Sequence, residues 1–181
     1  MVNRLLALKT NIEHWRSNKM QFIDKIIGKY DVKQLDLQWS NCELLKDDKD
    51  HFTLRGLKIF IKLLIQKLVL LGIKDVHVIS DSTIAWWNYD NDSNFNNVAS
   101  DLLIYECKRK GINASINAIN GAGFRKRYDE GLDFPSLLNN TSINSYTTIL
   151  IIGGWNDESI DQETIESSIN KFMRIYKSKI Y

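Results

Sequence analysis

Short apolar runs rich in β-branched residues alternate along this chain with longer segments in which apolar residues recur at helical spacing. The short runs are bounded by polar or glycine-containing turns, a pattern that predicts β-strands. Strands are expected over residues 4–9, 33–39, 75–80, 112–119 and 146–154. The last of these, "YTTILIIGG", is the most apolar, which is typical of a strand at the centre of a parallel sheet.

The longer segments predict helices over residues 11–28, 53–71, 98–110 and 160–177. Thr53 is expected to cap the second helix, and Gly72 and Gly111 are expected to end the second and third. Strands that alternate with helices of this length favour the α/β class, with a parallel sheet covered on both faces. We therefore expect one domain over residues 1–181, a three-layer α/β/α fold with a flavodoxin-like sheet of about five strands.

Charge and cysteine content narrow the possible classes of function. The net charge is +2, and the basic stretches at residues 108–110 and 125–127 are short, so no nucleic-acid partner is expected. Two cysteines do not make a disulfide framework, and no Cys/His spacing fits a zinc site. The longest apolar run, residues 57–71, is interrupted by polar residues, so no membrane span is expected. The beginning of the sequence lacks the features of a signal peptide, and a cytoplasmic location is expected.

Three polar turns follow predicted strands and are expected to meet at one edge of the sheet, beyond the carboxyl ends of the strands. The first is Ser80-Asp81-Ser82, where Ser82 is either a nucleophile or an ordinary turn serine. The second holds Gly121 and Gly123, which let a backbone N–H approach a ligand closely. The third holds Asn156, whose side-chain amide either donates to a developing oxyanion or caps the helix that begins near Asp157.

A fourth polar segment, "DDKDHFTLRG", precedes the helix expected from Thr53. Within it, Asp48 and His51 are three residues apart, so in a tight turn the carboxylate can reach the imidazole and fix its tautomer. The alternative is a solvated acidic turn with an incidental histidine. Of the other histidines, His14 is expected on a helix surface, and His77 is expected to be a structural residue within its strand.

Taken together, these four segments resemble the sequence blocks of the SGNH hydrolases, also called the GDSL esterase/lipase family. The family's Gly-Asp-Ser block is similar to residues 80–82, with Ser80 in place of the glycine. Its glycine block is similar to Gly121 or Gly123, and the choice between them stays open. Its Gly-x-Asn-Asp block matches residues 154–157, and its Asp-x-x-His block matches residues 48–51.

The order of the blocks departs from the family. The Asp/His block normally follows the serine, whereas here it lies within residues 1–72 and the other three lie within residues 73–181. Either the chain is a circular permutant, or it joins the end of one domain to the start of another. Because each expected element occurs once in cyclic order, permutation is favoured. A monomer and an exchanged homodimer, in which the Asp/His loop serves a neighbouring chain, both fit this order.

The resemblance implies a serine esterase that cleaves carboxylic esters through an acyl-enzyme intermediate, with no metal or cofactor. Ser82 would be the nucleophile, His51 the general base and Asp48 the acid that orients His51. The resemblance further implies an oxyanion hole made by the N–H groups of Ser82 and of Gly121 or Gly123, with the amide of Asn156.

The resemblance does not select one substrate among acyl esters, acetylated carbohydrates and thioesters. Trp86 and Trp155 flank the expected site and could line a pocket for the ester; the alternative for Trp86, with Trp87, is that it packs a helix onto the sheet. The alternative function is a catalytically inactive module of the same fold that binds a carbohydrate or an acyl ligand. A nucleic-acid binder that uses the "FRKRY" segment is a further alternative, which the low net charge disfavours.

Overall fold

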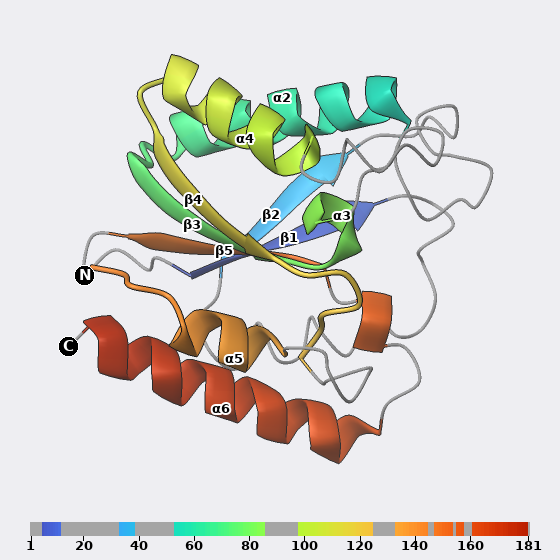
Figure 1. The fold of residues 1–181 in the computed structure, drawn as a ribbon, viewed down its shortest axis with the longest axis vertical. Helices are drawn as coiled ribbons and strands as arrows, with labels where there is room; N and C mark the ends of the chain where they lie inside the picture. Colours follow the sequence, from blue (N-terminus) through green and yellow to red (C-terminus); the bar gives the residue numbers. More distant parts are fainter. Residues whose placement is uncertain are drawn as a thin grey trace.

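The fold is an α/β arrangement of a parallel sheet between two layers of helices (Figure 1). The computed structural model describes residues 5–11, 33–38, 53–85, 98–124, 133–144, 147–153, 155–157 and 161–180. The strands are β1 (Leu5–Asn11), β2 (Lys33–Gln38), β3 (Asp75–Ser80), β4 (Asn113–Ala118) and β5 (Thr148–Ile152). The helices are α2 (Leu54–Leu70), α3 (Ser82–Ala85), α4 (Val98–Arg109), α5 (Phe134–Asn139) and α6 (Gln162–Ile180), with a 3₁₀ turn, η4, over Trp155–Asp157.

β3 lies between β5 and β4, and both pairings are parallel. β1 and β2 pair in parallel beside β5, which gives the order β2-β1-β5-β3-β4. Adjacent strands therefore all run the same way, and the described connection between the neighbours β3 and β4 passes through the helices α3 and α4, as a parallel pair requires. The predicted α/β class with a parallel sheet is confirmed.

The alternation of side chains along the strands creates two separate cores. On β3, Val76 and Val78 point to one face of the sheet, whereas His77 and Ile79 point to the other. The strand is buried on both faces, since Val76 to Ser80 are all buried. This two-sided burial explains why the strand reads as a continuous apolar run.

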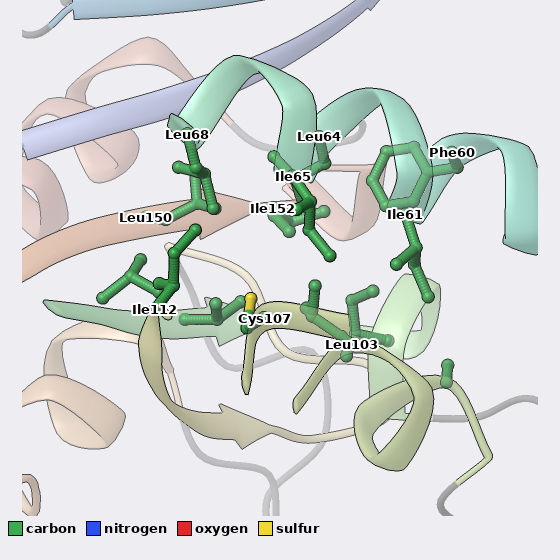
Figure 2. Packing of buried hydrophobic residues seen from close by; sticks show 14 of the residues in the cluster. Phe60, Ile61, Leu64, Ile65, Leu68, Leu103, Cys107, Ile112, Leu150 and Ile152 are labelled. Atoms are coloured by element: carbon green, nitrogen blue, oxygen red, sulfur yellow. The ribbon is translucent and has the colours of Figure 1, made fainter. Parts of the chain in front are cut away.

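The first core lies beneath α2 and α4 (Figure 2). Residues that recur at helical spacing along α2, from Leu57 through Leu64 to Leu68, are completely buried there. Burying each such side chain, relative to leaving it in water, stabilises the folded state by about 1.5–3 kcal/mol. The predicted cap is confirmed, because the Thr53 hydroxyl accepts from the N–H of Gly56 at 3.1 Å. Gly72 follows the helix with φ +69°, the conformation in which glycine commonly ends a helix.

The second core lies beneath α5 and α6, where Phe134 and Phe172 are buried with Ile149 of β5. α5 was not predicted, because six residues are too few to establish a helical period. A local signal for it does exist: Asp133 accepts from the N–H of Ser136 at 2.7 Å, and Pro135 stands in the first turn.

The remaining expectations divide between described and undescribed residues. The helix expected over residues 11–28 lies outside the described residues, apart from Asn11 at the end of β1. The other predicted strands and helices are present, with ends that differ by at most three residues; β3 has the predicted bounds. Within the described ranges, no helix combines the length and apolarity needed to cross a membrane.

Candidate functional site

The three polar turns expected to converge do so, because the strands that precede them end level with one another. Ser80 at the end of β3 pairs with Ile152 of β5 on one side and with Ala118 of β4 on the other. The turns that follow these residues therefore leave the same edge of the sheet. In Figure 1 this is the edge toward which the strand arrows point, where α3 lies.

The serine turn is built around two buried polar side chains. Ser80 is completely buried, and its hydroxyl donates to the carbonyl of Ile152 at 2.7 Å, which ties the end of β3 to β5. Asp81 is 1 % exposed, and its carboxylate accepts from the N–H of Thr83 at 2.9 Å, which caps α3. Ser82 is half-buried and is the first residue of α3, a position whose N–H has no partner inside the helix.

The glycine turn after β4 uses its two glycines for different reasons. Ala122 donates its N–H to the carbonyl of Ile119 at 3.0 Å, and Gly121 inside this turn has φ +77°. A positive φ at that position is what a type II turn requires. Gly123 instead leaves space, because a Cβ there would lie 2.5 Å from Oδ1 of Asp157. The turn is thus shaped partly by a residue 34 positions away in the sequence.

Asn156 connects the glycine turn to the serine turn. Its side-chain Nδ2 donates to the carbonyl of Ala122 at 2.8 Å and approaches Oδ2 of Asp81 at 3.5 Å. The alternative interpretation, that Asn156 caps the last helix, is wrong. That helix begins at Gln162, and its cap is Asp161, which accepts from the N–H of Thr164 at 2.8 Å.

Asp81 also packs closely against the turn after β5. Gly153 has φ +144°, and a Cβ there would lie 2.6 Å from Oδ2 of Asp81 and 3.1 Å from Cζ of Phe134. Only glycine fits this position without displacing the carboxylate or the ring. The carboxylate of Asp81 thus fills the space beside β5 that a side chain would otherwise occupy.

Part of the predicted site cannot be placed. Asp48, His51 and Trp86 lie outside the described residues, as does the side chain of Trp155. The structure therefore brings together Ser82, the two glycines and Asn156, but it does not place the expected base, its acid partner or the expected pocket aromatics. Two residues that were given no role from the sequence, Asp81 and Asp157, contact neighbouring turns: Asp81 lies beside Asn156, and Asp157 accepts from the N–H of Phe124. Their only sequence signal is their position beside Ser82 and Asn156.

His77 is a structural residue, as predicted. It is 3 % exposed, with Nδ1 2.7 Å from the Ser115 hydroxyl and Nε2 3.2 Å from the Thr141 hydroxyl. The Thr141 hydroxyl donates to the carbonyl of Leu137 and accepts from the Asn117 amide, so His77 Nε2 must carry a hydrogen and donate to it. Burial lowers the pKa of His77 to about 4, which keeps the ring neutral.

Across the described residues, no group of three or more His, Cys, Asp or Glu side chains is arranged to hold a metal ion. Comparison of the chain with protein-family models, with curated proteins and with solved structures finds no match. The case for a function therefore rests on the site's own geometry and on the resemblance of its motifs.

Proposed function

We propose that this protein is a serine ester hydrolase of the SGNH type with a permuted chain order. The observation that carries the proposal is the convergence of Ser82, the glycine turn and Asn156 at the level ends of β3, β4 and β5. A nucleophile needs hydrogen-bond donors beside it where negative charge develops in the transition state. Three segments far apart in sequence supply a hydroxyl and such donors at one edge.

The strand order supports the permutation. When the strands are counted in cyclic order from the serine strand, β3, β4, β5, β1 and β2 become first to fifth. The sheet order β4-β3-β5-β1-β2 then reads 2-1-3-4-5, the flavodoxin-like order. In that order the serine strand lies at the switch point of the sheet, where ligands of such folds bind.

The position of α2 supports a role for His51. The helix begins at Leu54, three residues after His51, and Leu54 packs on the same core as Ile84 of α3. Three residues span at most about 10 Å. Since α2 begins on the carboxyl side of the sheet, where α3 also lies (Figure 1), we propose that His51 acts at this edge.

The direction of one peptide group favours Gly121 over Gly123 as the oxyanion donor. The carbonyl of Ala122 faces Asn156. Because a trans peptide holds its C=O and N–H in opposite directions, the N–H of Gly123 points away from Asn156. The Gly121 N–H belongs to the central peptide of its turn, which takes no part in the turn's own hydrogen bond. Gly121 is therefore the glycine that we assign to the oxyanion hole.

In the proposed mechanism, His51 accepts the hydroxyl proton of Ser82 as the oxygen attacks the ester carbonyl. Asp48 accepts a hydrogen bond from the other ring nitrogen and stabilises the imidazolium. The tetrahedral oxyanion receives the N–H groups of Ser82 and Gly121 and the Asn156 amide. His51 then protonates the leaving alcohol, and water, activated by His51 in the same way, hydrolyses the acyl-serine ester.

The proposed substrates are small carboxylic esters, either acyl esters or acetylated carbohydrates, with Trp86 and Trp155 as candidate pocket residues. The substitution of Ser80 for the family's glycine does not favour the inactive binding module. The Ser80 hydroxyl is buried and donates to the carbonyl of Ile152. It therefore stabilises the pairing of β3 with β5 and does not obstruct the site.

Hydrolysis of p-nitrophenyl acetate by the purified protein tests the proposal. We expect turnover that Ser82→Ala lowers by at least about a thousandfold. A fluorophosphonate probe should add once, at Ser82, as located by peptide mass spectrometry. Ser178→Ala is the matched control, because this serine is exposed on α6 and its hydroxyl donates to the local carbonyl of Ile175.

A protein that folds but neither hydrolyses the ester nor reacts with the probe would support the binding module instead. Mixing the inactive Ser82→Ala and His51→Ala chains separates the two oligomeric states. Activity returns on mixing only if one chain's histidine serves another chain's serine.

A further inference from the structure

Asn156 and Asp157 are neighbours in sequence, and they contact different residues of one short segment of the glycine turn, residues 122–124. Asn156 donates its amide to the carbonyl of Ala122 at 2.8 Å. Asp157 accepts the N–H of Phe124 on Oδ2 at 2.9 Å. The two side chains therefore hold successive peptide groups of the turn, one through its carbonyl and the other through its N–H.

Gly123 lies between these two contacts and provides the space that Asp157 occupies. A Cβ at Gly123 would lie 2.5 Å from Oδ1, 2.9 Å from Cγ and 3.0 Å from Oδ2 of Asp157. Such distances do not occur between real side chains, so any larger residue at 123 forces the carboxylate away from the N–H of Phe124. The observed position of the Asp157 carboxylate therefore requires a glycine at position 123.

The turn is held in place from its other side as well. The carbonyl of Gly123 accepts the N–H of Phe134 at 2.7 Å, and the hydroxyl of Ser168 donates to the carbonyl of Phe124. Both of these partners come from the α5–α6 layer. Asp157 thus holds the turn on the side where Asn156 lies. Phe134 of α5 and Ser168 of α6 hold it on its other side.

A carboxylate that is only 7 % exposed is costly to bury, which suggests a role beyond filling space. We propose that Asp157 is a positioning residue, which keeps the glycine turn at a fixed distance from Asn156 so that the oxyanion donors stay aligned. It does not touch the substrate. This inference rests on the proposed function, since the donors matter only if an oxyanion forms.

Steady-state kinetics with p-nitrophenyl acetate tests the role. Asp157→Ala leaves the N–H of Phe124 without this partner, so we expect kcat to fall about 10–100-fold with KM within about twofold, because alignment acts in the transition state. Asp157→Asn keeps an acceptor oxygen of the same shape and should recover most of the lost kcat. If Asp157→Ala does not fold, Asp157→Ser takes its place in the comparison of kcat with Asp157→Asn.

Two controls separate positioning from simple loss of stability. Ile112→Val removes a methyl group from the other core and should lower the thermal midpoint while leaving kcat unchanged. In an Asn156→Ala background, Asp157→Ala should reduce kcat by clearly less than it does in the wild-type background, because one of the two donors whose spacing Asp157 maintains is already absent. Additive losses, or a kcat for Asp157→Ala no lower than that for Ile112→Val, would overturn the positioning role.

A second measurement tests the contact itself without any activity. Gly123→Ala should lower the urea midpoint strongly in the wild-type background and only slightly in the Asp157→Ala background, because the colliding carboxylate is then gone. Equal losses in the two backgrounds would contradict the packing. An inactive wild-type protein that nonetheless shows this coupling would overturn the proposed function and the catalytic role, while leaving the contact established.

Discussion

The side-chain nitrogen of Asn156 lies 2.8 Å from the carbonyl oxygen of Ala122, across the gap between the turns that follow β5 and β4. Because the same nitrogen also approaches Asp81, one amide joins all three turns at the edge of the sheet. The relative positions of Ser82, Gly121 and Asn156 thus depend on side-chain contacts between turns as well as on the strands.

Asn156→Ala is expected to lower kcat for p-nitrophenyl acetate about 10²–10³-fold, the usual cost of removing one oxyanion donor. Asn156→Asp should be comparably impaired, because it keeps the shape of the side chain and loses the donor. Asn139→Ala, at an exposed position on α5, is the control and should be unaffected. A variant of Asn156 with wild-type kcat would remove this residue from the oxyanion hole.

Gly153→Ala is expected to destabilise the protein by about 3 kcal/mol or more, as measured by urea denaturation. The new methyl group would collide with the Asp81 carboxylate and the Phe134 ring, and the backbone at φ +144° disfavours any L side chain. Gly111→Ala is a matched control, since Gly111 also has a positive φ but has open space, with no atom within 4 Å, where a Cβ would stand. It should cost only about 1–2 kcal/mol. Equal losses at the two positions would show that the close contact with Asp81 is absent.

Acid should destabilise the protein through His77. The pKa of His77 is about 4 in the folded protein, because burial disfavours the charged ring, against 6.5 for the ordinary side chain. Between those values the unfolded chain binds a proton that the folded chain does not, so stability is full above pH 6.5 and falls as the pH drops toward 4. The expected loss approaches about 3 kcal/mol, by order of magnitude.

The free energy of unfolding as a function of pH measures this effect. His77→Gln, which cannot titrate, should be less stable at pH 7 but should lose less stability between pH 6.5 and pH 4. If both proteins respond equally to pH in that window, the burial of a neutral His77 is not the cause.

Cys107 should be inert toward thiol reagents while the protein is folded. The thiol is 1 % exposed, and burial, with a smaller contribution from Glu106, raises its pKa to about 11. Because the thiolate is the reactive form, alkylation of Cys107 by iodoacetamide at pH 8 should occur only through unfolding. Mass spectrometry of the peptide that contains Cys107 should show a rate that rises with urea in step with the unfolding transition. Rapid alkylation in native buffer would mean that α4 does not pack as described.

Much of the fold is local in origin and was therefore predictable. The apolar spacing of α2, its Thr53 cap and the residues of β3 follow from patterns within a few residues of each other. The structural role of His77 was also predictable, since a histidine inside a buried strand must be satisfied by its neighbours. α5 was missed because its cap and proline signal a start without a period long enough to indicate a helix.

The candidate site was only half predictable, for a different physical reason. Sequence placed Ser82 and Asn156 at strand ends, and parallel topology brought those ends together. The contact of Asp157 with Gly123 and that of Asp81 with Gly153 join residues far apart in the chain, and no local pattern encodes them. The sequence likewise left the choice between Gly121 and Gly123 open, because it depends on the direction of a single peptide group.

The distance from a ring nitrogen of His51 to the hydroxyl oxygen of Ser82, measured in a crystal structure, tests the central claim most directly. The proposed hydrolase requires this distance to be about 3 Å, either within one chain or between two exchanged chains. A structure that places His51 and Ser82 on opposite sides of the molecule, with no second copy supplying the histidine, would contradict the account.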